Sequence, residues 1–150
     1  MNIAYFLIPK SNVAYLYDDF TFRQGLEKMK HHGYTAIPVI SRDGQYIGKV
    51  SEGDFLWRIL DGNQDEQRAF SMREMEQLHI CDIIRSDHHY PSVRITVSMD
   101  DLLISAMNQN FIPVVDDYDC FIGIVTRKDI IRYFADGKST DRTAPPKQTT

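Results

Sequence analysis

A mixed α/β fold made of two similar repeats is predicted by a spaced signature that occurs twice, with Ile37 and Ile112 in equivalent places 75 residues apart. In each copy, Gly follows Pro by ten positions, a hydroxyl residue follows Gly by three, and Asp follows by three more. The copies comprise Ile37, Pro38, Val39, Gly48, Ser51 and Asp54, and Ile112, Pro113, Val114, Gly123, Thr126 and Asp129. An internal repeat of this kind sets the architecture of the chain.

The first half of each signature predicts a β-hairpin. The β-branched runs at 37–40 and 112–115 are typical of buried strands. Because Pro has no N–H, we expect Pro38 and Pro113 at a first residue or at an edge. Turn-rich segments at 41–44 and 116–119 lead into return strands at 46–50 and 121–125. The Gly within each return strand indicates close approach of another backbone or of a ligand.

The second half of each signature predicts the start of a helix. Ser51 and Thr126 each precede an acid by three residues, which is the capping-box spacing, and apolar residues then follow at helical intervals. Amphipathic helices are also predicted before the hairpins, at roughly Thr21–His32 and Met99–Asn108. Each repeat therefore has the predicted order strand, helix, strand, strand, helix, and a helix at 71–78 bridges the two.

Composition sets the domain organisation and excludes several classes of function. We expect a first repeat at 1–75, a second at 76–135 and a disordered tail at 136–150, which lacks apolar periodicity. A net charge of −4 argues against nucleic-acid binding, and no apolar stretch is long enough for a membrane span. The two cysteines lack a redox or metal spacing and favour a cytoplasmic location. Adjacent histidines, at 31–32 and 88–89, are poor chelates, so no metal is predicted.

The repeated hydroxyl–acid pairs are the candidate site. A helix start binds anions through its free N–H groups, and the hydroxyls of Ser51 and Thr126 add donors there. Asp54 and Asp129 can accept hydrogen bonds from a ribose diol, as acidic residues do in dinucleotide folds. A site that binds a phosphate and a ribose diol and has an apolar slot for a flat base suits an adenosine nucleotide. Alternatively, each pair only caps its helix, although two copies in one chain favour a ligand.

The two Ile-Pro-Val strands and the two Gly-x-x-Ser/Thr-x-x-Asp segments resemble the tandem CBS-domain (Bateman) module from about Ile8 to Ala135. A closer resemblance is to the small stand-alone CBS-pair proteins of Gram-positive bacteria that bind cyclic di-AMP. It rests on Asn12-Val13-Ala14, on the segment 33–39 and on the segment 124–128. The resemblance implies a CBS pair with pseudo-two-fold packing, in which each nucleotide cleft draws on both repeats.

Two clefts follow from that resemblance. Cleft one would take Asn12, Ala14, Tyr34, Thr35, Ala36 and Pro38, with Thr126, Arg127, Lys128 and Asp129. Cleft two would take Val93, Asn110 and Ile112, with Ser51, Glu52 and Asp54. Cleft one should dominate, because it offers two cations to a phosphate, whereas cleft two offers only carboxylates. Repeat two also has three fewer residues before its hairpin, where repeat one has Gly-Tyr-Thr.

The leading hypothesis is a non-enzymatic sensor of an adenosine nucleotide, cyclic di-AMP first and AMP or ATP next, that regulates a separate partner protein. The alternative is a constitutive interaction scaffold with vestigial clefts. An enzyme is disfavoured because no nucleophile–base pair, metal cluster or phosphate loop is visible, and no cofactor is expected. The resemblance also implies a homodimer, with Leu56, Trp57 and Phe134 at or near buried helix faces.

Overall fold

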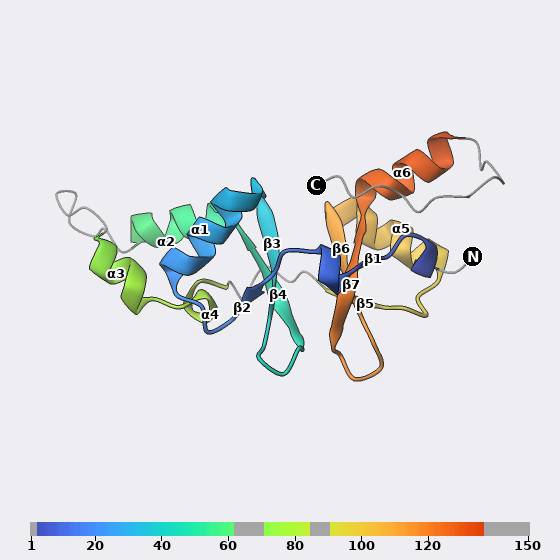
Figure 1. Cartoon of the computed structure of the whole chain (residues 1–150). Coiled ribbons are helices and arrows are strands. Elements are labelled where there is room, and N and C mark those ends of the chain that lie inside the picture. Colours follow the sequence, from blue (N-terminus) through green and yellow to red (C-terminus); the bar gives the residue numbers. More distant parts are fainter. Residues whose placement is uncertain (1–2, 62–70, 85–90, 137–150) are drawn as a thin grey trace. The chain divides into compact units, whose positions relative to one another are not determined.

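The computed structural model describes residues 3–61, 71–84 and 91–136, and these form two compact units. The middle unit is Ala14–Tyr90, and the split unit combines Met1–Val13 with Pro91–Thr150. The expected tail at 136–150 lies outside the described residues except for its first residue, Asp136. Figure 1 labels the elements of both units, and each unit is considered by itself.

The middle unit carries the first repeat. Its elements are β2 (Leu16–Tyr17), α1 (Phe22–His32), β3 (Ala36–Ile40), β4 (Tyr46–Ser51), α2 (Glu52–Asp61), α3 (Met72–Gln77) and α4 (Ile80–Ile83). The sheet has the order β2-β3-β4, with β2 parallel and β4 antiparallel to β3. The helices of this unit lie on one face of the β3–β4 hairpin (Figure 1).

The core of the middle unit forms where α1 and α2 pack on the sheet. Phe22 and Phe55 meet edge to face with ring centroids 4.9 Å apart, and both are buried with Ile37, Val39 and Val50. Full burial of one such side chain stabilises the fold by about 1.5–3 kcal/mol. Apolar residues at the helical spacing that predicted these helices therefore fill this core.

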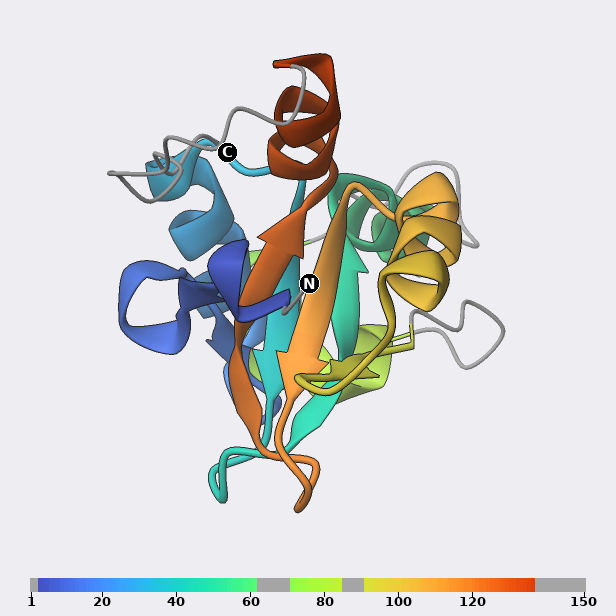
Figure 2. The ribbon, with the colours of Figure 1, turned by 90° about the vertical axis from the view of Figure 1, so that its right-hand side faces the viewer.

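The split unit carries the second repeat and the N-terminal segment. Its elements are the 3₁₀ turns η1 (Ile3–Tyr5) and η2 (Lys10–Asn12), and β1 (Ile8–Pro9), β5 (Val93–Arg94), α5 (Met99–Asn108), β6 (Phe111–Val115), β7 (Phe121–Thr126) and α6 (Arg127–Ala135). The sheet order is β1-β7-β6-β5. Figure 2 shows α6 continuing from the end of β7 that is opposite the hairpin turn.

The two hairpins repeat each other down to the register. Ala36 pairs with Ser51 in one unit, as Phe111 pairs with Thr126 in the other. In both hairpins, the register also shifts between the last two residue pairs before the turn. The predicted order of strand, helix, strand, strand, helix is confirmed in both repeats, and α5 has the predicted bounds.

The position of the two prolines differs from expectation. Pro38 and Pro113 lie in the middle of β3 and β6, which are central strands. However, β2 pairs with β3 only from Val39 onward, and β5 pairs with β6 only from Val114 onward. Each proline therefore lies where its strand has one neighbour, so its missing N–H leaves no hydrogen bond to a second strand unmade.

Close approach at Gly123 is confirmed, and the neighbour is the N-terminal segment. Strand β1 pairs antiparallel with β7, with Ile8 opposite Ile124 and Pro9 opposite Gly123. A Cβ atom on Gly123 would overlap the carbonyl oxygen of Ile8. At the equivalent Gly48, a Cβ atom would only touch Ile84 Cγ2 at 3.6 Å. The glycine is therefore required sterically in one repeat and not in the other.

The N-terminal segment thus completes the sheet of the second repeat. The sequence predicts a first repeat at 1–75 that includes the N-terminal segment, whereas the compact units group Met1–Val13 with Pro91–Thr150. The physical reasons are the β1–β7 pairing and an apolar anchor. Ile3 and Phe6 are fully buried in the core of the split unit, and the Phe6 ring meets Tyr133 of α6 edge to face at 5.3 Å.

Several apolar helix residues are exposed in the single chain, among them the three expected at or near buried helix faces of a homodimer. Leu56 is 57% exposed, Trp57 55% and Phe134 43%. Helices α2, α5 and α6 also have other exposed apolar side chains, namely Leu60, Ile104, Met107 and Ile131. The described residues of a single chain therefore leave these side chains exposed.

Candidate functional site

The middle unit brings one half-site together at the start of α2. The backbone N–H of Glu52 donates to the carbonyl of Thr35 at 3.0 Å, and Ala36 pairs with Ser51. The entry to β3 and the start of α2 are therefore joined directly. Thr35 and Ala36 therefore lie beside the backbone of Ser51 and Glu52.

The acid of this half-site is satisfied by its own helix cap. Asp54 Oδ2 accepts hydrogen bonds from the Ser51 N–H at 2.8 Å and from the Ser51 hydroxyl at 3.1 Å. The Asp54 N–H donates in turn to Ser51 Oγ at 3.3 Å. This is the reciprocal capping box predicted from the sequence. A ligand that used Asp54 would have to compete with these bonds.

The split unit brings the equivalent half-site together at the start of α6. The Arg127 N–H donates to the carbonyl of Asn110 at 2.9 Å, as Glu52 does to Thr35. The Asp129 N–H donates to Thr126 Oγ1 at 3.2 Å, so the hydroxyl caps the helix as predicted. The framework of the two half-sites is therefore the same.

The acid of the split unit differs. Asp129 is only 3% exposed, and neither of its carboxylate oxygens has a hydrogen-bond partner among the described residues. The reciprocal bond of the capping box is not formed here. A buried carboxylate without donors carries a desolvation cost of about 1–3 kcal/mol or more. Buried side-chain acceptors without a partner are few in folded proteins.

The two cations that follow Thr126 have different surroundings. Arg127 is half-buried, and its Nε donates to the carbonyl of Ala106 in the last turn of α5 at 2.7 Å. Lys128 is exposed at the start of α6. Sequence reasoning treated both as phosphate contacts and did not find the bond between Arg127 and α5.

Tyr34 is held between its own unit's core and a histidine. Its ring packs against the apolar core and stacks on His32, with centroids 5.3 Å apart and planes 23° apart. Burial lowers the pKa of His32 below its ordinary value, and the positive charges of His31 and Lys28 lower it further. One face of the tyrosine ring is therefore already covered by a neutral imidazole at pH 7.

The remaining predicted residues fall in both units. Asn12 is exposed in η2 of the split unit, which also holds Val93, Asn110 and Ile112. Ala14 and Pro38 belong to the middle unit, where Ala14 is half-buried and Pro38 is buried. Each expected cleft draws on both units, so the composition of the two clefts stays a prediction.

One buried polar residue was missed entirely. Gln109 is 4% exposed, and its Nε2 donates to the carbonyl of Pro91 at 3.1 Å, while Oε1 has no partner among the described residues. Gln109 precedes Asn110 as Tyr34 precedes Thr35, so it takes the place of the tyrosine in the second repeat. That equivalence could have been found by aligning the two repeats from the hairpin backward.

The chain belongs to the family of the CBS domain, whose model matches residues 7–61 and 80–136. This family match confirms the tandem repeat, its α/β class and the resemblance to CBS-pair proteins. None of the helices in the described part of the chain has the length and apolar character needed to cross a membrane.

Several solved structures have the same fold. A crystal structure of CbpB in complex with c-di-AMP matches with a TM-score of 0.78 at 22% identity, covering 91% of this chain and 85% of that one. A hypothetical conserved protein from Geobacillus kaustophilus matches with a TM-score of 0.79 at 24% identity, covering 91% and 97%. CBSX2 in complex with AMP matches with a TM-score of 0.68 at 22% identity, covering 90% and 96%.

Curated relatives from Methanocaldococcus jannaschii are longer. An L-aspartate semialdehyde sulfurtransferase is 25% identical over 107 residues, which are 71% of this chain and 18% of that protein. An uncharacterised protein is 27% identical over 113 residues, which are 71% of this chain and 38% of that protein. The chain therefore spans well under half the length of these two relatives.

Proposed function

We propose that the protein is a non-enzymatic sensor of an adenosine nucleotide, with cyclic di-AMP as the first candidate and AMP or ATP next. Ligand state would change its affinity for a separate partner protein. The single observation that carries this proposal is the Asp129 carboxylate, which is buried at the start of a helix, two residues beyond Arg127, and has no hydrogen-bond partner in the described part of the chain. A ribose diol supplies the two donors that this carboxylate lacks.

The remaining contacts follow the same chemistry. The free N–H groups at the start of α6 suit a phosphate, and Lys128 adds a positive charge. Tyr34 is half-buried directly before Thr35, and the exposed part of its ring is the proposed contact for a base. Cleft two is the weaker candidate, because Asp54 is already engaged by Ser51. Matched structures that contain c-di-AMP or AMP support this choice of ligand class.

Regulation requires that the partner distinguish two states of the protein, so the ligand must bind one state more tightly than the other. The exposed apolar faces of α2, α5 and α6 support association with a second copy of the chain, because patches of this kind mark interfaces. A cytoplasmic location is part of the proposal. The second candidate function is a scaffold that binds its partner constitutively, and the apolar faces serve that function equally well.

Calorimetric titration of the full chain with cyclic di-AMP, AMP, ATP and S-adenosylmethionine tests the proposal. We expect binding of at least one adenosine nucleotide, with a stoichiometry of one dominant site per chain. Light scattering with and without the ligand reports the oligomeric state in parallel. Absence of binding for all four ligands would leave the scaffold as the better description.

A further inference from the structure

The two helices that precede the hairpins end in different ways. Helix α1 ends at Gly33, whose φ of 68° allows its N–H and that of Tyr34 to bond to carbonyls of the last turn. Helix α5 ends at Gln109, which is extended at φ −138°. The second repeat has no glycine between α5 and β6, so it lacks the left-handed residue with which many helices end.

A side chain replaces the missing backbone cap. The last carbonyls of a helix have no partner within the helix. The carbonyl of Ala106 receives its hydrogen bond from Arg127 Nε at 2.7 Å, and the carbonyl of Ile104 receives one from Asn108 Nδ2 at 3.3 Å. A guanidinium also suits the negative end of the helix dipole, and a charge-assisted bond is stronger than a neutral one.

Arg127 is bonded to the chain on both sides of the turn from α5 to β6. Its side chain holds Ala106 before the turn, while its backbone N–H holds Asn110 after it. The same residue is the first of α6, directly after Thr126 and two residues before Asp129. The end of α5 and the start of α6 are therefore joined through one arginine.

We propose that Arg127 is a positioning residue that caps α5 and thereby fixes the orientation of the half-site at Thr126 and Asp129, an inference that rests on the proposed nucleotide site. Because its Nε is used on Ala106, the guanidinium of Arg127 is held at the end of α5, whereas the Lys128 side chain is exposed. Lys128 then supplies the positive charge that a phosphate meets. The two adjacent cations have separate roles, one structural and one electrostatic.

Three variants of the full chain separate these roles. Arg127→Met removes the charge and the donors but keeps an apolar stem of similar length. Arg127→Lys retains a charged donor that can reach a helix carbonyl. Lys128→Met is the matched control, since it removes the neighbouring exposed charge from the same helix turn. Each variant is studied by thermal unfolding, by amide hydrogen exchange and by titration with cyclic di-AMP at low and high salt.

Without ligand, we expect Arg127→Met to lower the unfolding midpoint by about 3–6 °C. Exchange of the amides at 105–108, in the last turn of α5, should become about tenfold faster. Arg127→Lys should restore most of both effects, and Lys128→Met should change neither. Unaltered exchange in Arg127→Met would overturn the cap, whether or not any nucleotide binds.

With cyclic di-AMP, we expect Arg127→Met to weaken binding about tenfold. The ratio of the Kd at high salt to the Kd at low salt should stay the same as in the wild type. Lys128→Met should instead reduce that ratio, because it removes a screened charge. The positioning role is wrong if Arg127→Met flattens the salt dependence at unchanged stability, which indicates direct phosphate contact. The positioning role is also wrong if Arg127→Met lowers the unfolding midpoint without weakening the binding of cyclic di-AMP. Failure of the wild type to bind nucleotide refutes the proposed function and leaves the exchange result to decide the cap.

Discussion

The Ser51 N–H and hydroxyl both donate to Asp54 Oδ2, at 2.8 and 3.1 Å, whereas the corresponding carboxylate of Asp129 accepts nothing within the described residues. The two half-sites share sequence pattern, register and helix position. They differ in whether the acid is used by its own helix. One repeat therefore uses its acid in the helix cap, and the other leaves its acid buried without a partner among the described residues, which carries a desolvation cost.

Substitution of the two acids should therefore have opposite consequences for binding and stability. We expect Asp129→Ala to weaken adenosine-nucleotide binding by about 1.5–3 kcal/mol, and Asp54→Ala to weaken it far less. In the absence of ligand, Asp54→Ala should destabilise the protein by about 0.5–2 kcal/mol through loss of the cap. Asp129→Ala should leave stability unchanged or raise it, because a buried unpartnered carboxylate is removed.

Calorimetry and urea unfolding of both variants check this pair of effects. Asp129→Asn is a useful control, since it keeps the shape but replaces one acceptor by a donor. Equal losses of affinity at the two positions would contradict a single dominant cleft. A loss of stability in Asp129→Ala comparable to that in Asp54→Ala would show that Asp129 has a structural partner.

The two equivalent glycines should respond differently to a methyl group. We expect Gly123→Ala to lower the free energy of unfolding by about 1–3 kcal/mol, because its Cβ would overlap the Ile8 carbonyl and force β1 away from β7. Gly48→Ala meets only Ile84 Cγ2 at an ordinary contact distance and should be nearly neutral. Denaturant unfolding measures both. A similar cost at both positions would mean that the β1–β7 pairing does not determine the effect.

Tyr34 should distinguish a dinucleotide from a mononucleotide. A second adenine needs a stacking platform, so Tyr34→Ala is expected to weaken cyclic di-AMP binding by about 1–3 kcal/mol. AMP, with one base, should lose less. Tyr34→Phe keeps the ring and should retain the affinity for both ligands. If Tyr34→Ala affects both ligands alike, or AMP binds the wild type as tightly as cyclic di-AMP, a mononucleotide sensor is the better reading.

His32 should titrate below its ordinary pKa in the folded protein. Burial is the largest cause, followed by the charges of His31 and Lys28. Because the unfolded chain binds this proton more readily, the contribution of His32 to stability is present above about pH 6.5 and is lost as pH falls through that value toward the folded pKa. NMR titration of the imidazole gives the folded pKa directly.

The same titration tests the cause of that shift. Tyr34→Ala removes the ring that stacks on His32 and should move its pKa back toward the ordinary value. His31→Gln removes one of the repelling charges and should move the pKa in the same direction by a smaller amount. A His32 pKa that is insensitive to Tyr34→Ala would show that other neighbours bury the ring.

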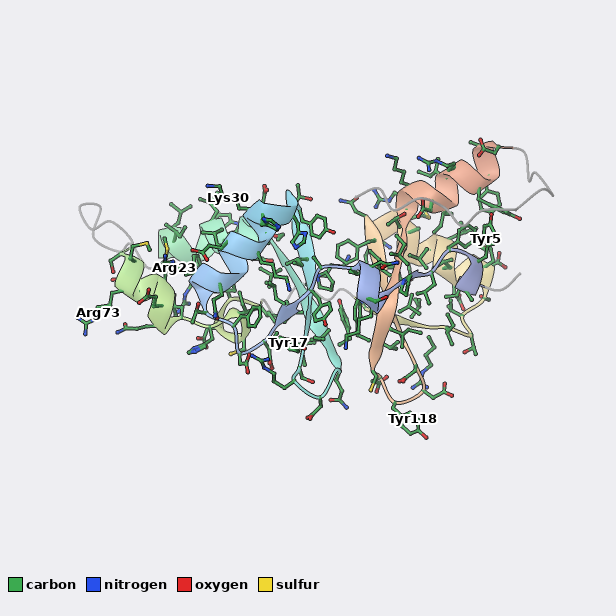
Figure 3. All side chains as sticks on the ribbon, in the orientation of Figure 1. Tyr5, Tyr17, Arg23, Lys30, Arg73 and Tyr118 are labelled. Carbon is green, nitrogen blue, oxygen red and sulfur yellow. The ribbon has the colours of Figure 1, made fainter. Side chains whose placement is uncertain are left out.

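Turn composition was as informative as the signature itself. The segment 116–119 was expected to reverse the chain, and Asp116 Oδ1 does so by accepting from the N–H groups of Tyr118 and Cys120. Asp119 occupies the left-handed region at φ 63°. Figure 3 shows Tyr118 at the tip of this turn, where it is 81% exposed. Local hydrogen bonds of this kind depend on near neighbours in the chain, so the sequence predicts them well.

The sequence by itself determined the repeat, its element order, the hairpins and the hydroxyl caps at Ser51 and Thr126, because periodicity, turn residues and caps act over a few positions. Only the tertiary structure decided which sheet the N-terminal segment joins, since β1 pairs with a strand more than a hundred residues away. It also decided that Arg127 bonds to α5 and that Asp54 is engaged while Asp129 is not. Which hydrogen bonds form depends on side-chain orientations that packing selects. The same residue spacing is compatible with a bonded or an unbonded side chain.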